Sequence, residues 1–464
     1  MTNRKNTICA MATPAGGAIG IIRISGDNAI NIADKVFEKK GNTKTITDAK
    51  GYSLHYGKIL SEEKGSKTAS LIDEVMLALF RTPHSYTGED CIEISCHGSA
   101  YIMKNILQTL IRQGCVMAQP GEFTQRAFLN GKLDLSQAEA VADLIAATNS
   151  ATHKMAISQL KGNFSDELAR LREQLLKLTS LLELELDFSD HEDLEFADRT
   201  QLTALSKQID SRITALAASF ASGKAMKEGI AVAIAGKTNV GKSTLLNLLV
   251  GEERAIVSDI HGTTRDVIED TTVIKGVTFR FIDTAGIRDT EDTIEQLGIN
   301  RTYRKINEAA IVIWMLDNMP TKKETEDILN LCKHKTLIVV NNKTDITDIT
   351  PQLSTLFPQT HIIGISAKRN TNIKQLRDTI HNAAGIPTFT ENDVIITSAR
   401  HYDSLLKAHE SITNVIQALD MNLSGDLISE DLRSALHHLA DITGGAITTE
   451  ETLSNIFQHF CIGK

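Results

Sequence analysis

The feature that most constrains this 464-residue sequence is the loop Gly236-Lys-Thr-Asn-Val-Gly-Lys-Ser243, which fits the pattern G-x-x-x-x-G-K-[ST]. The apolar run Ile230–Ala235 precedes the loop, and the leucine-rich run 244–250, which has a helical pattern, follows it. A strand, a glycine loop and a helix in this order point backbone N–H groups and the positive end of the helix dipole at an anion. The segment therefore predicts a nucleotide-phosphate site.

Short apolar runs alternate with helical patterns around this loop, which predicts an α/β domain over residues 226–388 with a mostly parallel sheet. Lys275-Gly276 separates two of the runs and predicts a hairpin, so one edge of the sheet should be antiparallel. The six expected strands are Ile230–Ala235, Val267–Ile274, Val277–Ile282, Ala310–Leu316, Leu337–Val340 and Ile362–Ile365.

The rest of the sequence divides into one mixed region and two helical regions. Residues 1–128 hold β-branched runs, such as Ile19–Ile24, between Gly and Pro, and they predict an α+β domain. Leu and Ala recur at three- and four-residue spacing through 129–225, and the tail 389–464 is helical again. Because neither helical region is clearly large enough to bury its own core, we expect one helical domain with the α/β domain inserted into it. The fold class is thus α/β plus all-α.

Composition limits the classes of function. No apolar run approaches the roughly 18 residues that span a bilayer, and six widely spaced cysteines without a CxxC pair indicate reduced thiols in a cytoplasmic protein. The net charge of −9 argues against a uniformly basic nucleic-acid coat. Residues 1–133 carry 16 Lys and Arg against 12 Asp and Glu, so any basic patch there is mild.

Further motifs complete a phosphate and magnesium site. Lys242 is expected to reach the β- and γ-phosphates, and the Ser243 hydroxyl is expected to ligate Mg²⁺. Asp283-Thr-Ala-Gly286 ends an expected strand, so its carboxylate can hold Mg²⁺ through water and its last N–H can meet the γ-phosphate. Thr263-Thr264 can supply the second hydroxyl ligand of Mg²⁺.

Two more motifs select the base. Asp345, in Asn342-Lys-Thr-Asp345, can accept hydrogen bonds from N1–H and from the exocyclic amine of guanine, whereas adenine would leave the carboxylate unpaired. Ser366-Ala-Lys368 closes the base pocket. A phosphate loop alone would not distinguish ATP from GTP, but the motifs together predict that the nucleotide is GTP or GDP.

The residue after the Asp-Thr-Ala-Gly motif departs from the Ras-type pattern. Ras-type enzymes carry there the glutamine that orients the attacking water, whereas this sequence has Ile287. An apolar side chain cannot position water. The nearby candidates are Arg288, Asp289, Glu291 and Glu295, and their spacing leaves the choice open.

Nearly the whole sequence resembles the MnmE (TrmE) family of tRNA-modification GTPases, within the TrmE-Era-EngA-like group. The segments outside the GTPase motifs make the resemblance specific. They are Ala12-Thr-Pro14, Gly20–Gly26, Ser85-Tyr-Thr-Gly-Glu-Asp90, Glu93-Ile-Ser-Cys-His-Gly98, Pro120–Asp134 and Phe460-Cys-Ile-Gly-Lys464.

The resemblance implies an N-terminal folate-binding domain that forms a homodimer, and a helical domain interrupted by a Ras-like GTPase domain. Family members work with the FAD-dependent partner MnmG. Together they place a (carboxymethyl)aminomethyl group on C5 of the wobble uridine of certain tRNAs, using a one-carbon unit from 5-formyltetrahydrofolate or a related tetrahydrofolate. Their GTPase domains are activated by K⁺ and by dimerisation across the nucleotide.

Site residues carried over by position follow the same resemblance. Asn239, Ser258, Ile260 and Thr263 match the K⁺ ligands, and Ser243 and Thr264 match those of Mg²⁺. Glu295 matches the catalytic glutamate, with Arg288 and the terminal Cys461 as further catalytic candidates. The full nucleotide set is Asn239, Val240, Gly241, Lys242, Ser243, Thr244, Ser258, Asp259, Ile260, His261, Gly262, Thr263, Thr264, Asp283, Thr284, Ala285, Gly286, Asn342, Lys343, Thr344, Asp345, Ser366, Ala367 and Lys368.

The folate-contacting positions of the family correspond to Arg23, Glu93, Lys132 and Lys464. A carboxylate suits the amidine edge of the pterin, and cations suit the glutamate tail. A competing interpretation is a GTP-driven ribosome-assembly switch without modification chemistry. Against it, the sequence holds no basic, aromatic-interleaved segment and no convincing KH-type loop.

Overall fold

The structure is a computed structural model. It describes residues 6–41, 45–187 (the backbone alone for 184–187), 199–251, 270–282, 306–386, 390, 392–445, 453, 456–458, 460 and 462–463. The chain forms two compact units. The first comprises Met1–Ala142, Ser165–Arg172 and Leu436–Lys464, and the second comprises Asp143–Phe164 and Glu173–Ala435.

A seven-stranded sheet dominates the first unit, with the order β3-β4-β5-β6-β2-β1-β7. All neighbouring strands are antiparallel except β1 and β7. The strands are β1 (Ile8–Met11), β2 (Ile19–Ser25), β3 (Phe37–Lys39), β4 (Ser53–Leu60), β5 (Leu71–Phe80), β6 (Cys91–His97) and β7 (Val116–Met117).

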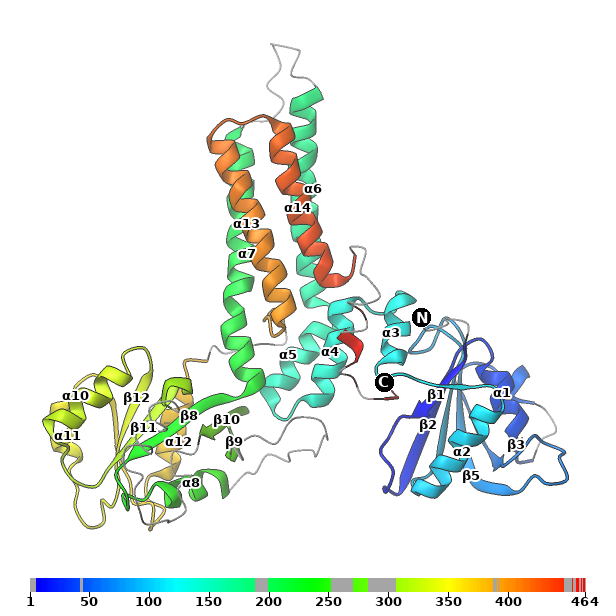
Figure 1. Ribbon diagram of the computed structural model, residues 1–464, viewed down its shortest axis with the longest axis horizontal. Helices are drawn as coiled ribbons and strands as arrows, with labels where there is room; N and C mark the ends of the chain where they lie inside the picture. Colours follow the sequence, from blue (N-terminus) through cyan, green and yellow to red (C-terminus); the bar gives the residue numbers. More distant parts are fainter. Residues whose placement is uncertain are drawn as a thin grey trace, which may run out of the picture. The chain divides into compact units, whose positions relative to one another are not determined.

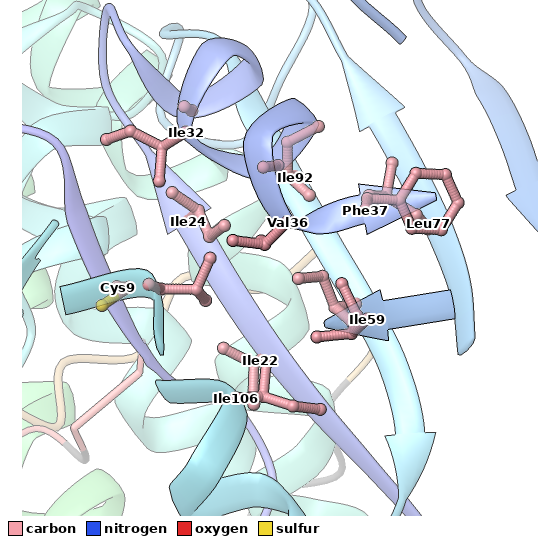
Figure 2. Packing of buried hydrophobic residues seen from close by; sticks show 14 of the residues in the cluster. Cys9, Ile22, Ile24, Ile32, Val36, Phe37, Ile59, Leu77, Ile92 and Ile106 are labelled. Carbon is pink, nitrogen blue, oxygen red and sulfur yellow. The ribbon is translucent and has the colours of Figure 1, made fainter. Parts of the chain in front are cut away.

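Helices α1 (Ala29–Val36) and α2 (Ala100–Arg112) cover one face of this sheet, and a short 3₁₀ helix, η1 (Ile46–Asp48), packs beside α1. Ile22 and Ile24 of β2 are buried there against Ile106 of α2 and Ile32 of α1, as Figure 2 shows. Side chains alternate between the two faces of a strand. Residues between the buried ones, Arg23 among them, therefore project from the opposite face.

The same unit contains α3 (Glu122–Leu129) and the start of α4 (Leu135–Ala146). Leu453 and Phe457, from the C-terminal end of the chain, are buried against Leu135 and Ala138 of α4. The last residues of the chain are thus part of the first unit.

In the second unit a six-stranded sheet has the order β13-β12-β11-β8-β10-β9, and only the β9–β10 pair is antiparallel. The strands are β8 (Ile230–Gly236), β9 (Asp270–Ile274), β10 (Val277–Ile282), β11 (Ile311–Leu316), β12 (Thr336–Asn341) and β13 (His361–Gly364). The predicted parallel sheet and its Lys275-Gly276 hairpin are confirmed; residues 267–269 of the second predicted strand lie outside the described residues.

Every residue of β11 is buried, because helices cover both faces of the sheet. The helices are α8 (Lys242–Gly251), α10 (Lys322–Leu331), α11 (Thr350–Leu356) and α12 (Ile373–Ala383). Leu249 and Ile380 belong to the core on one face, and Ile328 and Leu353 belong to the core on the other. This is the doubly wound arrangement of a P-loop domain.

The helical regions contain α5 (Ser150–Leu160), α6 (Asn163–Asp187), α7 (Arg199–Glu228), α13 (Ala399–Asp420) and α14 (Gly425–Thr443). Helix α7 ends two residues before β8, and α13 begins after the last element of the α/β domain; Figure 1 shows this order along the chain. The rings of Phe220 on α7 and Tyr402 on α13 stack at 4.5 Å between centroids. The α/β domain is therefore inserted between two helices that pack together, as predicted.

None of the helices in the described part of the chain combines the length and the apolar character that a membrane crossing requires. The domain boundaries at 128, 225 and 388 stay predictions.

Candidate functional site

The phosphate loop lies between the end of β8 and the start of α8, as its pattern predicts. Asn239 and Gly241 both have left-handed backbones, with φ of 62° and 102°. A Cβ at Gly241 would also overlap the Asn342 side-chain amide, so this position needs glycine for two reasons. Val240, between them, is buried, whereas the side chains of Asn239 and Ser243 are exposed.

Lys242 lies at the first position of α8 and folds over the loop. Its Nζ donates to the carbonyl oxygens of Gly236 at 2.8 Å and Lys237 at 2.7 Å. The ammonium is therefore held beside the N-terminus of α8, where an anion would be stabilised by the helix dipole.

Asn342 joins three of the predicted motifs. Its Nδ2 donates to the Val240 carbonyl at 2.7 Å, and its Oδ1 accepts the Ala367 N–H at 3.0 Å. The side chain is almost completely buried. The phosphate loop, the Asn-Lys-Thr-Asp segment and the Ser-Ala-Lys segment are thus fixed relative to each other.

The neighbouring residues hold Asp345 in place. Thr344 N–H donates to the Ile365 carbonyl at 3.1 Å, and the Lys343 ammonium pairs with Asp317 at 2.7 Å. A hydrogen bond from the Ser366 hydroxyl, with smaller contributions from the nearby Arg369 and Lys368 charges, lowers the pKa of Asp345 below its ordinary value. The carboxylate is therefore an ionised acceptor at neutral pH, as a guanine edge requires.

Two features of this site were not predicted from the sequence. Arg369 pairs with Asp345 through Nε at 3.3 Å. Lys237, in the phosphate loop, pairs with Glu324 at 2.8 Å, and Glu324 also closes the capping box of α10 with Thr321. Arg369 directly follows the Ser-Ala-Lys segment, so its place in the sequence was an available signal. The Thr321–Glu324 spacing indicates a helix cap but does not indicate the contact of Glu324 with Lys237.

Part of the predicted nucleotide site lies outside the described residues. These positions are Ser258, Asp259, Ile260, His261, Gly262, Thr263, Thr264, Asp283, Thr284, Ala285, Gly286, Arg288 and Glu295. Cys461 and Lys464 also lie outside them. Within the described residues, no group of three His, Cys, Asp or Glu side chains is placed to hold a metal ion.

A second cluster of predicted residues lies in the first unit. Arg23 of β2 and Glu93 of β6 are directly opposite in register, and the guanidinium pairs with the carboxylate at 2.8 Å. Arg23 Nη1 also donates to the Gly463 carbonyl at 3.2 Å, next to the predicted Lys464. This hydrogen bond joins Arg23 and Gly463, which are 440 residues apart in the sequence.

Aromatic rings flank this pair. The Arg23 guanidinium lies 5.6 Å from the ring centroid of Tyr86 and 5.6 Å from that of Phe123. Burial raises the pKa of Tyr86, whose hydroxyl shares a hydrogen bond with Thr124. Neither ring was predicted from the sequence to belong to this cluster, although both lie in the segments that carried the resemblance.

The fourth predicted residue, Lys132, contacts the loop that carries Tyr86. Its Nζ donates to the Pro83 carbonyl at 3.1 Å, and its side chain packs near Gly88. The structure therefore brings Arg23 and Glu93 together directly and places Lys132 beside the same loop.

A buried ionic network supports that loop. Arg126 is 7 % exposed and pairs with Glu89 at 3.1 Å and with Glu122 at 2.9 Å. Ser25 donates to Glu89 at 2.7 Å. Because a buried charge needs partners, these contacts fix the Tyr86 loop against α3.

Comparisons with known proteins cover nearly the whole chain. A family model described as "GTP-binding protein TrmE N-terminus" matches residues 7–132, and one described as "MnmE helical domain" matches residues 135–461. Two similar relatives carry the name tRNA modification GTPase MnmE. That of Phocaeicola vulgatus is 53 % identical over 496 residues, covering 99 % of each chain, and that of Bacteroides fragilis is 53 % identical over 472 residues, covering 99 % of this chain and 100 % of the relative.

Among solved structures, a variant of Era from Aquifex aeolicus bound to GDP and AlF₄⁻ is 28 % identical, with a TM-score of 0.27. The match covers 39 % of this chain and 66 % of that one.

Proposed function

The chain belongs to the MnmE family of tRNA modification GTPases, and from this membership we propose how its own residues serve the activity. It is a GTPase that acts in tRNA modification. We propose that it hydrolyses GTP to GDP and phosphate in a K⁺-activated cycle, with its GTPase domains dimerising across the nucleotide. The observation that carries the nucleotide assignment is Asn342, which ties the phosphate loop to the base pocket.

In this proposal the phosphate loop binds the phosphates, and the Asn-Lys-Thr-Asp and Ser-Ala-Lys segments bind the base. Asn342 links all three segments. Asp345 accepts from guanine N1–H and the exocyclic amine, with the Ala367 and Lys368 region closing over the base. Lys242 turns from the loop carbonyls to the β- and γ-phosphates, which lie at the N-terminus of α8. Thr244, the remaining motif residues and the 258–264 segment complete the site.

Oxygen donors in the phosphate loop fit hard cations. The Ser243 hydroxyl is exposed at the start of α8, and we propose that it holds Mg²⁺ together with Thr264. Asn239 is exposed on a left-handed backbone, and we propose that its side-chain oxygen holds K⁺ together with Ser258, Ile260 and Thr263. Cations there neutralise charge that develops between the β- and γ-phosphates. Glu295 and Arg288 are proposed to orient the attacking water.

The Arg23 cluster is proposed to bind a tetrahydrofolate such as 5-formyltetrahydrofolate. Glu93 is a carboxylate for the amidine edge of the pterin, Tyr86 and Phe123 offer aromatic walls, and Lys132 and Lys464 are cations for the glutamate tail. We propose that Cys461 takes part in the modification, and that the reaction is carried out with the FAD-dependent partner MnmG on C5 of the wobble uridine, in the cytoplasm.

A homodimer through the N-terminal domain is also proposed. Leu54 and Tyr56 on β4 and Met76 on β5 are exposed, at 62 %, 40 % and 36 %, on one face of the sheet. Exposed apolar side chains gathered on one face are typical of a protein interface.

Nucleoside analysis of bulk tRNA tests the proposed function. We expect wobble-uridine modification to disappear when the gene is deleted and to return with the wild-type gene or with Lys374→Gln on the surface of α12. Asp345→Asn should fail to restore it, because the variant loses selectivity for guanine. A ribosome-subunit defect with intact wobble modification would instead support the assembly switch.

A further inference from the structure

We propose that Arg369 competes with the guanine base for the Asp345 carboxylate and so sets the affinity of the chain for guanine nucleotides. This inference rests on the proposed guanine pocket. In the described structure, Arg369 Nε lies 3.3 Å from Asp345 Oδ2, and the Asp345 side chain is only 14 % exposed. The guanidinium therefore lies against one oxygen of the carboxylate, which also accepts a hydrogen bond from the Ser366 hydroxyl.

The backbone that carries Arg369 is fixed. Its N–H donates to the Ser366 carbonyl at 3.2 Å, and Ser366 and Thr371 form an antiparallel bridge. Asn370 and Asn372, on either side of Thr371, have left-handed backbones with φ of 54° and 61°. Asparagine tolerates this conformation, which closes a tight turn.

The side chain of Arg369, by contrast, is 69 % exposed. Only the side chain therefore has to leave when a base enters, and it leaves into water. A guanidinium has five donors and no acceptor. It can offer nothing to the N1–H and amine of guanine, which are also donors. The guanine base and the Arg369 guanidinium therefore both donate to the Asp345 carboxylate, and they compete for its oxygens.

The opposite expectation follows from charge alone. Removing a cation close to a bound nucleoside diphosphate should weaken binding through the loss of attraction. Competition predicts that removing Arg369 tightens binding, because free Asp345 no longer has to release a partner. The sign of the effect therefore separates the two roles.

The test is the Kd for GDP of the full chain, measured by calorimetry for wild type, Arg369→Gln and Lys374→Gln. Lys374 is an exposed cation on the next helix and gives the matched control for loss of one positive charge. Because an exposed ion pair is only a weak competitor, we expect Arg369→Gln to bind GDP roughly 1.5- to 5-fold more tightly than the wild type. The difference in Kd for GDP between Arg369→Gln and the wild type should decrease as the KCl concentration rises, because salt screens the ion pair.

Thermal unfolding first establishes that both variants are folded. Equal or weaker GDP binding by Arg369→Gln overturns the inference, and so does equal tightening by Lys374→Gln, which would be a general charge effect. If wild type fails to bind GDP while remaining folded, the proposed guanine pocket itself is wrong. The two failures are thus distinguishable.

Discussion

Asn342 makes two hydrogen bonds in opposite senses, one to the phosphate loop and one from the Ser-Ala-Lys segment. Alanine at this position would leave the Val240 carbonyl and the Ala367 N–H without this partner in a buried setting. An unpaired buried group costs about 1–3 kcal/mol. We expect Asn342→Ala to lower the melting temperature and to weaken GDP binding by roughly tenfold or more.

Calorimetry and thermal unfolding measure both effects. Asn382→Ala on the exposed side of α12 is the matched control and should change neither. If Asn342→Ala binds GDP with wild-type affinity, the hydrogen bonds of Asn342 are not needed to hold the phosphate loop and the base pocket in place.

The five cysteines in the described part of the chain are all buried. Burial raises the pKa of Cys91 to about 12 and that of Cys96 and Cys332 to about 11. A hydrogen bond with Cys9, together with burial, raises the pKa of Cys115. Since the thiolate is the reactive form, the thiols of Cys91, Cys96, Cys115 and Cys332 should be inert near neutral pH. Cys9 is fully buried, so a reagent in solution should not reach it.

Labelling of the native protein with an aromatic disulfide reagent at pH 7.5 should therefore detect no more than one fast thiol. We expect that signal to disappear in Cys461→Ser. Two or more fast thiols would contradict the burial of the others, and an unchanged signal in Cys461→Ser would assign it to another cysteine.

At the scale of elements, the start of α5 depends on Asn149. Its side chain accepts the Thr152 N–H at 2.8 Å in a capping box and donates to the Thr278 hydroxyl of β10 at 2.8 Å. Loss of an N-cap costs about 0.5–2 kcal/mol, and loss of the second hydrogen bond costs about 0.5–1.5 kcal/mol. Asn149→Ala should therefore destabilise the chain by about 1–3 kcal/mol in denaturant unfolding.

Asn149→Ser separates the two contributions. Serine can cap the helix but is too short to replace the amide that reaches Thr278, so we expect a smaller loss than for alanine. Equal losses in the two variants would show that the cap contributes little to stability.

Elements could be predicted from the sequence where both faces are buried. The strands β8, β11 and β12 are built on continuous apolar runs, and they lie within a residue or two of the expected positions. By contrast, β4 and β5 were not predicted. Each buries one face only and exposes residues such as Leu54 and Met76 on the other. Polar residues and a glycine interrupt β4, whereas the apolar run Val75–Phe80 of β5 was an available signal.

The sites divide in the same way. Gly241, Lys242 and Asp345 could be predicted because their motifs are short and local. The contacts of Arg23 with Gly463, and of Glu324 with Lys237, join residues far apart in the sequence. Only the folded chain brings them together.

At the scale of the whole molecule, the two ends of the chain meet within the first unit. Gly463 has φ of +96°, and a Cβ there would overlap the Met11 carbonyl oxygen. Gly463→Ala should therefore displace the tail from Arg23 and weaken 5-formyltetrahydrofolate binding by roughly tenfold, an effect of about 1.4 kcal/mol.

GDP affinity should not change in this variant, because the phosphate loop and base pocket belong to the second unit. Ile462→Ala, next to it and 51 % exposed, is the control and should bind folate as the wild type does. Unchanged folate binding by Gly463→Ala would remove the C-terminus from the proposed folate site.

The phosphate loop of this chain is proposed to support cation-dependent GTP hydrolysis. The most direct measurement is the GTP turnover rate of the purified chain in KCl and in NaCl at equal ionic strength. We expect strong stimulation by K⁺, because Asn239 and the 258–263 segment are proposed to bind that ion beside the phosphates. Equal rates in the two salts would contradict the K⁺ site and the mechanism built on it.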